Sequence, residues 1–308
     1  MNKNSVDLSV KIGKITLKNP VIPAAGTFGY GQEMADFVDF NRMGALITKA
    51  ISLKPRLGNP PPRFTETIAG AVFSGGSQNV GLERFISDKL PFYRQFSTPL
   101  LVAIRGDTVS EFTEVAKRLS QEKGVSGLEL VISCPNLERG ILYSTDPALT
   151  YEVVSAVRKV TDLTMIPKLS PDVTDITVIA KACVEAGADG ITLINSPRAM
   201  AIDIYTKKSK IHPNTIASLI GPCIKPIALR LVYQVVQAVK VPVIGVGGIT
   251  GPEDALEFLI AGATAIEIGT MKFIDPSVMD HTIEGIKDYL TKTGVPRITD
   301  IIGSFSTR

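Results

Sequence analysis

The stretch VPVIGVGGIT (Val241–Thr250) decides the fold class of this chain. An apolar strand runs directly into Gly247-Gly248, and a helical pattern follows. Further along, AIEIGT (Ala265–Thr270) is a second short strand with a glycine at its end. Glycines let a backbone approach a phosphate closely, and a helix N-terminus attracts an anion. Two such turns favour phosphate binding over tight turns alone. A phosphate site after the last two strands is typical of a (β/α)8 barrel.

Outward from this stretch, short apolar segments alternate with longer amphipathic ones. The short segments are apolar on both faces, as strands buried on both faces are. The predicted strands are Val21–Ala25, Gly44–Lys49, Leu100–Ile104, Leu128–Ser133, Met165–Leu169, Gly190–Ile194, Val243–Val246 and Ala265–Gly269. The predicted helices are Val109–Lys123, Leu149–Val160, Val173–Ala186, Ile227–Val239 and Pro252–Ala261.

This alternation predicts an α/β chain that forms a single (β/α)8 TIM barrel domain over residues 1–308. A doubly wound sheet is the rival fold. The GxGxxG motif of its dinucleotide-binding form is missing from the sequence. We prefer the barrel because the seventh and eighth predicted strands both end in Gly-rich turns, where barrels often bind phosphate.

Local signals at helix ends support the helical segments. Thr250 is placed to cap a helix, with Pro252 in the first turn and Glu253 placed for a capping box. Gly187 and Gly262 follow helical stretches as C-terminal stops do.

Two stretches, Ile51–Lys89 and Pro197–Lys225, are longer than ordinary loops. Long insertions on a rigid scaffold usually shape or cover a site. We expect them over the C-terminal face of the barrel.

Composition excludes several classes of protein. Hydrophobic residues make up 44% and charged residues 20%, which favours a large core over disorder. A net charge of +3 without a run of Lys or Arg gives no support for nucleic-acid binding. We see no signal peptide or membrane span and expect a cytoplasmic protein. Cys134, Cys183 and Cys223 form no CxxC pair, so we expect neither a disulfide framework nor a metal site.

Cys134 in ELVISCPN follows an apolar strand. Pro135 stops that strand and Asn136 can organise the turn. A thiol at the carboxyl end of a barrel strand faces the mouth, and its ordinary pKa of about 8.5 suits proton transfer near neutrality. No His lies nearby in sequence, which weakens a role as nucleophile. We predict a functional thiol; a cysteine that only packs is the alternative.

Two lysines lie in predicted strands, Lys49 in LITKA and Lys168 in IPKLS. Lys is rarely buried unless it is paired. A flavin ring that gathers negative charge, or a phosphate, would serve as partner; a salt bridge to a carboxylate is the alternative. Asn195 and Ser196 end GITLINS, where they either offer hydrogen bonds to a polar ring or cap the next turn.

Together these motifs resemble the class 1 dihydroorotate dehydrogenases over nearly the whole chain. The matching pieces are AAGTFGYG (Ala24–Gly31), TKAISLKPRLGNPPPR (Thr48–Arg63), ISCPN (Ile132–Asn136), KLSPDVTDI (Lys168–Ile176), TLINS (Thr192–Ser196), MAID (Met200–Asp203), GPCIKPIALR (Gly221–Arg230), GVGGITGPEDALEFLIAGA (Gly245–Ala263) and IGT (Ile268–Thr270). GTFGYG and IKPIALR are more similar to the class 1B branch.

The resemblance implies an FMN-binding barrel that oxidises dihydroorotate to orotate in pyrimidine biosynthesis. It implies that Cys134 removes a proton from C5 while hydride passes from C6 to flavin N5. It also implies a homodimer and a second, electron-transfer subunit that carries FAD and a 2Fe–2S cluster.

The resemblance also implies two sets of ligand contacts. The FMN contacts are Ala25, Gly26, Lys49, Ala50, Ala103, Val131, Lys168, Ile194, Gly221, Gly247, Gly248, Gly269 and Thr270. The substrate contacts are Lys49, Phe73, Ser74, Gly75, Gly76, Ser77, Asn136, Asn195 and Ser196.

Four positions depart from the family pattern. Where the family reads LNxxGLxN, this chain has Phe73 for the substrate-binding Asn and Ser77 for the second Leu. Val131 replaces the first Asn of NISCPN, and Ala103 replaces an Asn near the flavin. Each lost hydrogen bond to a charged group is worth roughly 1.5–3 kcal/mol.

Four hypotheses therefore remain for the function. The first is dihydroorotate oxidation. The others are a flavoenzyme for a less polar related ring, a non-catalytic flavin-binding paralogue, and a flavin-free barrel that binds a sugar phosphate.

Overall fold

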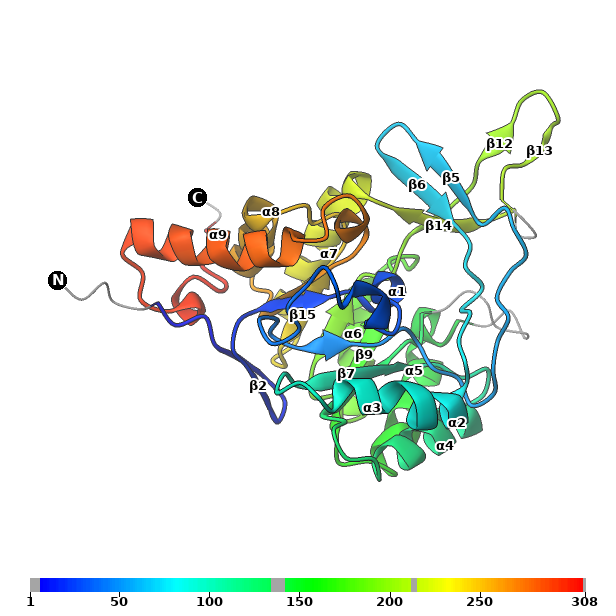
Figure 1. The fold of residues 1–308 in the computed structure, drawn as a ribbon, viewed down its shortest axis with the longest axis horizontal. Coiled ribbons are helices and arrows are strands. Elements are labelled where there is room, and N and C mark those ends of the chain that lie inside the picture. Colours follow the sequence, from blue (N-terminus) through cyan, green and yellow to red (C-terminus); the bar gives the residue numbers. More distant parts are fainter. Residues whose placement is uncertain (1–5, 134–141, 212–214, 307–308) are drawn as a thin grey trace.

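The computed structural model describes residues 6–133, 142–211 and 215–306. Eight parallel strands form one sheet in the spatial order β3-β16-β15-β10-β9-β8-β7-β4. A hydrogen bond of 2.9 Å from Gly44 N to Val21 O joins the two end strands, so the sheet closes (Figure 1). The predicted (β/α)8 barrel is confirmed, and the doubly wound alternative is wrong.

The barrel strands match the predicted segments closely. They are β3 (Val21–Pro23), β4 (Leu46–Ile47), β7 (Leu100–Ile104), β8 (Gly127–Leu130), β9 (Thr164–Leu169), β10 (Ile191–Leu193), β15 (Val243–Val246) and β16 (Ala265–Ile268). Every residue of these strands is buried, which explains why they are apolar on both faces. The main difference is β4, which covers only two of the six residues predicted for Gly44–Lys49.

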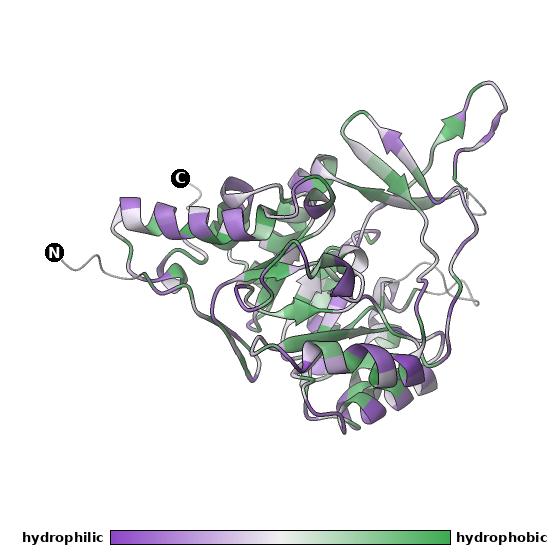
Figure 2. Cartoon of the chain, in the orientation of Figure 1, coloured by the Kyte–Doolittle hydropathy of each residue, from purple (hydrophilic) through white to green (hydrophobic). Residues whose placement is uncertain are grey.

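Helices surround the barrel and turn their apolar sides inward (Figure 2). The longer ones are α4 (Val109–Leu119), α5 (Pro147–Arg158), α6 (Ile176–Glu185), α7 (Lys225–Ala238), α8 (Pro252–Ile260) and α9 (Val278–Thr293). Helix α9 was not predicted from the sequence, although its buried residues recur at helical spacing: Val278, Met279, Thr282, Ile283, Ile286 and Leu290.

Short helical turns complete the connections. They are α1 (Ala25–Phe28), η1 (Gln32–Met34), α2 (Leu82–Arg84), η2 (Phe85–Lys89), α3 (Leu90–Tyr93), η3 (Tyr143–Thr145), η4 (Pro222–Ile224), η5 (Thr270–Phe273) and η6 (Ile298–Asp300). At the amino ends of the barrel strands, the hairpin of β1 (Val10–Ile12) and β2 (Ile15–Leu17) packs against Thr164 through its turn at Gly13.

The start of α8 differs from the predicted capping box. The N-cap is Gly251, and its helix receives no side-chain cap. Asp254, not Glu253, reaches back: its Oδ2 accepts from Thr250 N at 2.7 Å and from Thr250 Oγ1 at 2.5 Å. The prediction for Glu253 is wrong, because the N-cap, Gly251, lies one residue after the position assumed for the cap. Gly187 (φ 96°) and Gly262 (φ 114°) follow α6 and α8 with positive φ, as predicted.

The two long insertions meet over the C-terminal face of the barrel. They form an antiparallel sheet in the order β11-β14-β6-β5, which we call the mouth sheet (Figure 1). Its strands are β5 (Phe64–Thr67), β6 (Gly70–Phe73), β11 (Arg198–Ala199) and β14 (Ala217–Ile220). Beyond it projects the hairpin of β12 (Ile202–Asp203) and β13 (Lys208–Ser209).

The mouth sheet has a small core of its own. Val72, Ile211 and Ala217 form a buried cluster that is separate from the main core of the barrel. Side chains alternate along β6, so Val72 faces this cluster, while Ala71 and Phe73 face the barrel. The insertions therefore cover the site, as expected. Among the described residues, no helix combines the length and apolarity that a bilayer crossing requires.

Candidate active site

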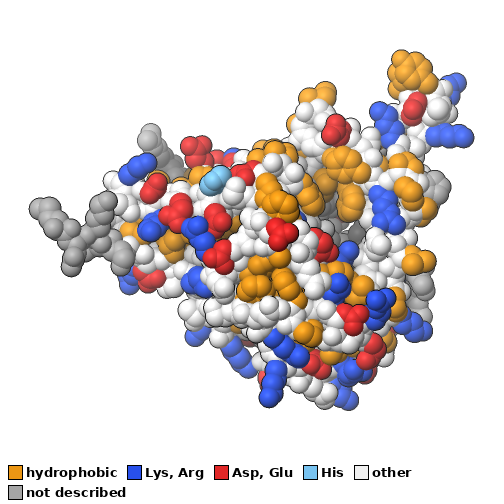
Figure 3. Space-filling view, in the orientation of Figure 1, with side chains coloured by type: hydrophobic (Ala, Val, Ile, Leu, Met, Phe, Trp, Pro, Cys, Tyr) orange, Lys and Arg blue, Asp and Glu red, His pale blue; other side chains and the backbone are white. Residues whose placement is uncertain are grey.

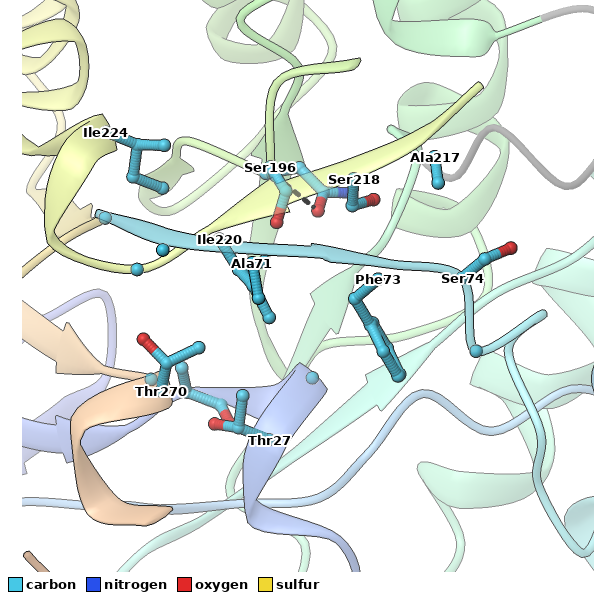
Figure 4. A pocket seen from close by; sticks show the side chains of 18 of the residues that line it. Thr27, Ala71, Phe73, Ser74, Ser196, Ala217, Ser218, Ile220, Ile224 and Thr270 are labelled. Carbon is cyan, nitrogen blue, oxygen red and sulfur yellow. Dashed lines mark hydrogen bonds between the residues drawn. The ribbon is translucent and has the colours of Figure 1, made fainter. Parts of the chain in front are cut away.

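A cavity of about 1380 Å³ lies between the carboxyl ends of the barrel strands and the mouth sheet. Ala71 and Phe73 point into it from β6, and Thr27 and Thr270 face them from the opposite side (Figure 4). Barrel loops therefore form the floor and the two insertions form the roof. This is the face on which (β/α)8 barrels carry their active sites.

Glycines shape one end of the cavity. A Cβ on Gly247 (φ 136°) would approach Cβ of Ala228 to 2.8 Å, and one on Gly248 (φ 73°) would approach Lys225 N to 2.6 Å. Both positions therefore need glycine for the turn itself, as expected if these glycines serve tight turns. Gly26 differs, because a Cβ there would meet nothing within 4 Å and would enter open space.

These turns fit the phosphate end of the FMN that the resemblance implies. Gly221 (φ 110°) precedes η4 and α7, and it lines the same end of the cavity as Gly247 and Gly248. Two loops thus present backbone without side chains to one space, next to the start of a long helix. The residues present suit a phosphate there.

Most of the predicted site residues come together around this cavity. Its wall includes Ala25, Gly26, Lys49, Ala50, Val131, Lys168, Ile194, Gly221, Gly247, Gly248, Gly269 and Thr270 of the predicted FMN contacts. It also includes Phe73, Ser74, Gly75, Gly76, Ser77, Asn195 and Ser196 of the predicted substrate contacts.

Three predicted residues are not placed on that wall. Ala103 is fully buried on β7, opposite Glu129 of β8 in the sheet register, and does not reach the cavity. Cys134 and Asn136 lie outside the described residues.

Lys49 is a half-buried cation at the cavity wall. Its Nζ lies 5.5 Å from the centroid of the Tyr30 ring, and the described residues show no ion pair for it. Burial lowers the pKa of Lys49, the Glu33 carboxylate partly offsets this, and Arg63 adds to the lowering. A cation without a carboxylate partner suits an anionic ligand.

Lys168 forms salt bridges to carboxylates, as the alternative in the sequence analysis predicted. Its Nζ lies 2.7 Å from Glu267 Oε2 and 3.4 Å from both carboxylate oxygens of Glu129. Burial lowers the pKa of Lys168, but the two carboxylates outweigh burial and the pKa is raised. A contact between Lys168 and the flavin remains a prediction, since this lysine also lines the cavity.

The polar pair after β10 is largely engaged in the turn. Asn195 Nδ2 donates to Ser133 O at 3.0 Å and to Ser133 Oγ at 2.9 Å. Asn195 Oδ1 accepts from Ser196 N at 2.8 Å. The turn-capping alternative therefore describes this asparagine, which joins the loop after β8 to the loop after β10. Its contact with substrate remains a prediction.

Apolar side chains occupy the part of the wall where the family pattern has amides. Phe73 is 37% exposed and projects into the cavity, and Val131 lines the floor. Neither side chain offers a hydrogen bond to a carboxylate or a ring carbonyl. This side of the cavity is suited to an apolar ring face.

Two functional candidates were missed in the sequence. Glu129 in GLEL and Glu267 in AIEI are 1% and 0% exposed inside the barrel. A charged residue in an apolar strand needs a partner, and this holds for the two carboxylates as it does for Lys168. The same signal in the sequence could therefore have identified them.

Comparisons with known proteins agree with this geometry. A family model described as "Dihydroorotate dehydrogenase" matches residues 7–290. Two relatives are both described as "Dihydroorotate dehydrogenase B (NAD(+)), catalytic subunit". The protein from Geotalea uraniireducens is 50% identical over 302 residues, 98% of this chain and 99% of that protein. The protein from Geobacter sulfurreducens is 48% identical over 299 residues, 97% and 98% of the two chains.

A solved structure is similar in fold. "Crystal structure of DHODH in complex with ferulenol from Eimeria tenella" aligns with a TM-score of 0.81 and 22% identity, over 99% of this chain and 90% of that chain. At this identity the likeness supports the barrel fold alone.

Proposed function

This chain belongs to the dihydroorotate dehydrogenase family, and we propose that it oxidises dihydroorotate to orotate in pyrimidine biosynthesis. Enzymes of this family are FMN-dependent oxidoreductases that act on a CH–CH bond, and FMN is the cofactor of this chain. The main structural support for this function, apart from family membership, is the position of the predicted contacts. The predicted FMN and substrate contacts from nine separate segments line one cavity at the carboxyl ends of the barrel strands.

The chain's own residues divide the work of the reaction. FMN, when bound, supplies the acceptor for the hydride from C6. We assign the removal of the C5 proton to Cys134, which lies four residues after the end of β8 in the sequence. Lys49 attracts the anionic substrate from the cavity wall. Asn195 holds the loops after β8 and β10 together through Ser133.

The mouth sheet excludes water from the reacting ring. Ala71 and Phe73 cover the cavity from above, and Val131 closes part of the floor. Where the mouth sheet keeps water away, the electrostatic effect of Lys49 on an anion is stronger.

A visible spectrum tests the proposal directly. We expect the purified protein to be yellow from bound FMN, and we expect anaerobic addition of dihydroorotate to bleach the absorbance near 450 nm. A yellow protein that dihydroorotate does not bleach contradicts the proposed substrate and leaves the flavin site intact. A colourless protein that takes up no FMN contradicts the cofactor assignment as well.

A less polar ring is the second candidate substrate. The observation that favours it is Phe73, whose side chain points into the cavity where the family pattern has a substrate-binding Asn. Bleaching by another dihydropyrimidine or a cyclic enone, but not by dihydroorotate, supports this candidate.

We also propose the assembly that the resemblance implies: one domain per chain, a homodimer in the cytoplasm, and an electron-transfer subunit with FAD and a 2Fe–2S cluster. An apolar rim around the cavity opening supports a partner of this kind (Figure 3). Phe64, Ile216, Phe273 and Ile274 line the cavity and are 52%, 54%, 66% and 77% exposed. Exposed apolar clusters of this kind mark interaction sites.

A further inference from the structure

Three charged side chains meet inside the barrel below the cavity. Glu129 comes from β8, Lys168 from β9 and Glu267 from β16, and their exposed fractions are 1%, 7% and 0%. Lys168 Nζ contacts both carboxylates, at 2.7 Å for Glu267 and 3.4 Å for Glu129. The two carboxyl groups therefore meet at one ammonium group. Glu129 and Lys168 reach the cavity wall, whereas Glu267 lies behind them.

The charges of this group do not balance when all three residues are ionised. Two carboxylates and one ammonium leave one negative charge, and an uncompensated buried charge costs several kcal/mol. No other titratable group among the described residues contributes to the electrostatics of Glu129 or Lys168. Thr192, which is uncharged, is the partner of Lys168 in the register of β10 and β9.

One buried oxygen also lacks a donor. Glu267 Oε1 has no hydrogen-bond partner among the described residues. A proton held between two neighbouring carboxyl groups would satisfy such an oxygen and remove the excess charge in the same step.

We propose that Glu129 and Glu267 hold one proton between them, so that Glu129, Lys168 and Glu267 form an electrically neutral group beneath the flavin. Glu267 is then a positioning residue. The 2.7 Å ion pair between Glu267 Oε2 and Lys168 Nζ fixes the position of the lysine side chain and partly neutralises its charge toward the cavity. This inference rests on the proposed function only in that FMN occupies the cavity.

The pKa direction agrees with this geometry. Burial, followed by the nearby Glu267 carboxylate, raises the pKa of Glu129 well above its usual value, and Lys168 only partly opposes them.

Infrared difference spectroscopy on the oxidised holoprotein tests the shared proton. The wild type should show a carboxylic-acid C=O band that shifts in D₂O. Glu129→Gln and Glu267→Gln should each abolish the band, because the remaining carboxylate pairs with Lys168. Lys168→Met should raise its intensity about twofold, because both buried carboxyls then become neutral. A wild type without the band, or a band that survives both glutamine changes, overturns the proposal.

The midpoint potential of bound FMN supplies a second readout. If the group is neutral, each single glutamine variant should have a midpoint potential close to that of the wild type. Each variant keeps one carboxylate and one ammonium, so its net charge is also zero. The double change Glu129→Gln, Glu267→Gln leaves Lys168 unpaired and should shift the potential to a more positive value. A positive shift in each single variant indicates a net negative group and contradicts the proposal.

Both readouts are independent of the substrate. A protein that fails to oxidise dihydroorotate still reports the infrared band and the flavin potential, so the two proposals fail separately. If the double variant does not fold, the single variants still decide between a neutral and a negative group.

Discussion

The ring of Phe73 lies against Gly75, and a Cβ on Gly75 would come within 2.6 Å of Phe73 Cζ. The missing side chain at position 75 thus leaves room for the aromatic ring that projects into the cavity. Position 75 controls the orientation of Phe73 without contacting the barrel core.

Gly75→Ala should displace the Phe73 ring. We expect KM for the physiological substrate to change severalfold, with kcat within about twofold of the wild type, because binding rather than chemistry is altered. The melting temperature should stay the same, since the ring is partly exposed. Gly251→Ala is the control, because a Cβ there meets nothing within 4 Å and lies outside the cavity wall. Equal kinetics for the two variants would contradict the role of Gly75.

Asparagines at positions 73 and 131 should restore polar contacts to an orotate-like ligand. We expect the Phe73→Asn, Val131→Asn double variant to bind orotate at least about tenfold more tightly, because each hydrogen bond to a charged group is worth roughly 1.5–3 kcal/mol. A titration that follows the flavin spectrum measures this. Ile68→Asn, at an exposed position that is not part of the cavity wall, should show no gain. An unchanged affinity in the double variant counts against the alignment of these positions.

Cys134→Ala should leave FMN bound and slow substrate-driven flavin reduction by roughly 10²–10⁴-fold, the usual contribution of a general base. Stopped-flow absorbance under anaerobic conditions gives the rate. Cys223→Ala is the matched control, since Cys223 is partly buried and lies outside the cavity wall. A normal rate for Cys134→Ala removes this thiol from the mechanism.

Two glycines of the cavity should respond to alanine in opposite ways. Gly26 lies in α1, where a Cβ projects into open space, so Gly26→Ala should weaken FMN binding without loss of stability. Gly247 has φ 136° and a close approach to Ala228, so Gly247→Ala should lower the melting temperature of the apoprotein. Calorimetry and FMN titration separate these effects. Loss of stability in Gly26→Ala would show that the space at α1 belongs to the packed core.

Lys272 should make stability depend on pH. This lysine is 2% exposed beside the rings of Phe28 and Phe273, and burial lowers its pKa from 10.5 to about 8. The folded state therefore disfavours the charged form. The free-energy cost of burying the charged lysine is fully present below pH 8, and it disappears as the pH rises to 10.5.

Lys272→Met should accordingly be more stable than the wild type at pH 7, on the order of 1–3 kcal/mol after the lost contact with the rings is subtracted. The difference should close between pH 8 and pH 10.5. Denaturant unfolding at both ends of this range measures it. A difference that is the same at pH 7 and pH 10.5 would show that the charge of Lys272 is not the cause.

The barrel could be predicted from the sequence because its strands are buried on both faces. That burial leaves continuous apolar runs such as LLVAI in β7, which no solvent-facing pattern interrupts. The mouth sheet left no such signal. Its strands β6 and β14 are short and partly exposed, and their pairing joins segments that lie far apart in the sequence.

The part of the candidate site that could be predicted from the sequence consists of residues that directly follow a barrel strand. Lys49, Asn195 and the glycine turns follow barrel strands directly, and all of them line the cavity. The partners of these residues were not predictable. That Asn195 donates to Ser133, and that Lys168 meets Glu129 and Glu267, depends on the packing of separate loops and strands.

The separate cluster of Val72, Ile211 and Ala217 has a consequence for how such an enzyme diverges. Selection can exchange residues in the roof of the cavity while the interior that keeps the barrel folded stays as it is. New ligand preferences then arise at little risk to folding, and one cofactor-binding scaffold becomes a starting point for several substrates.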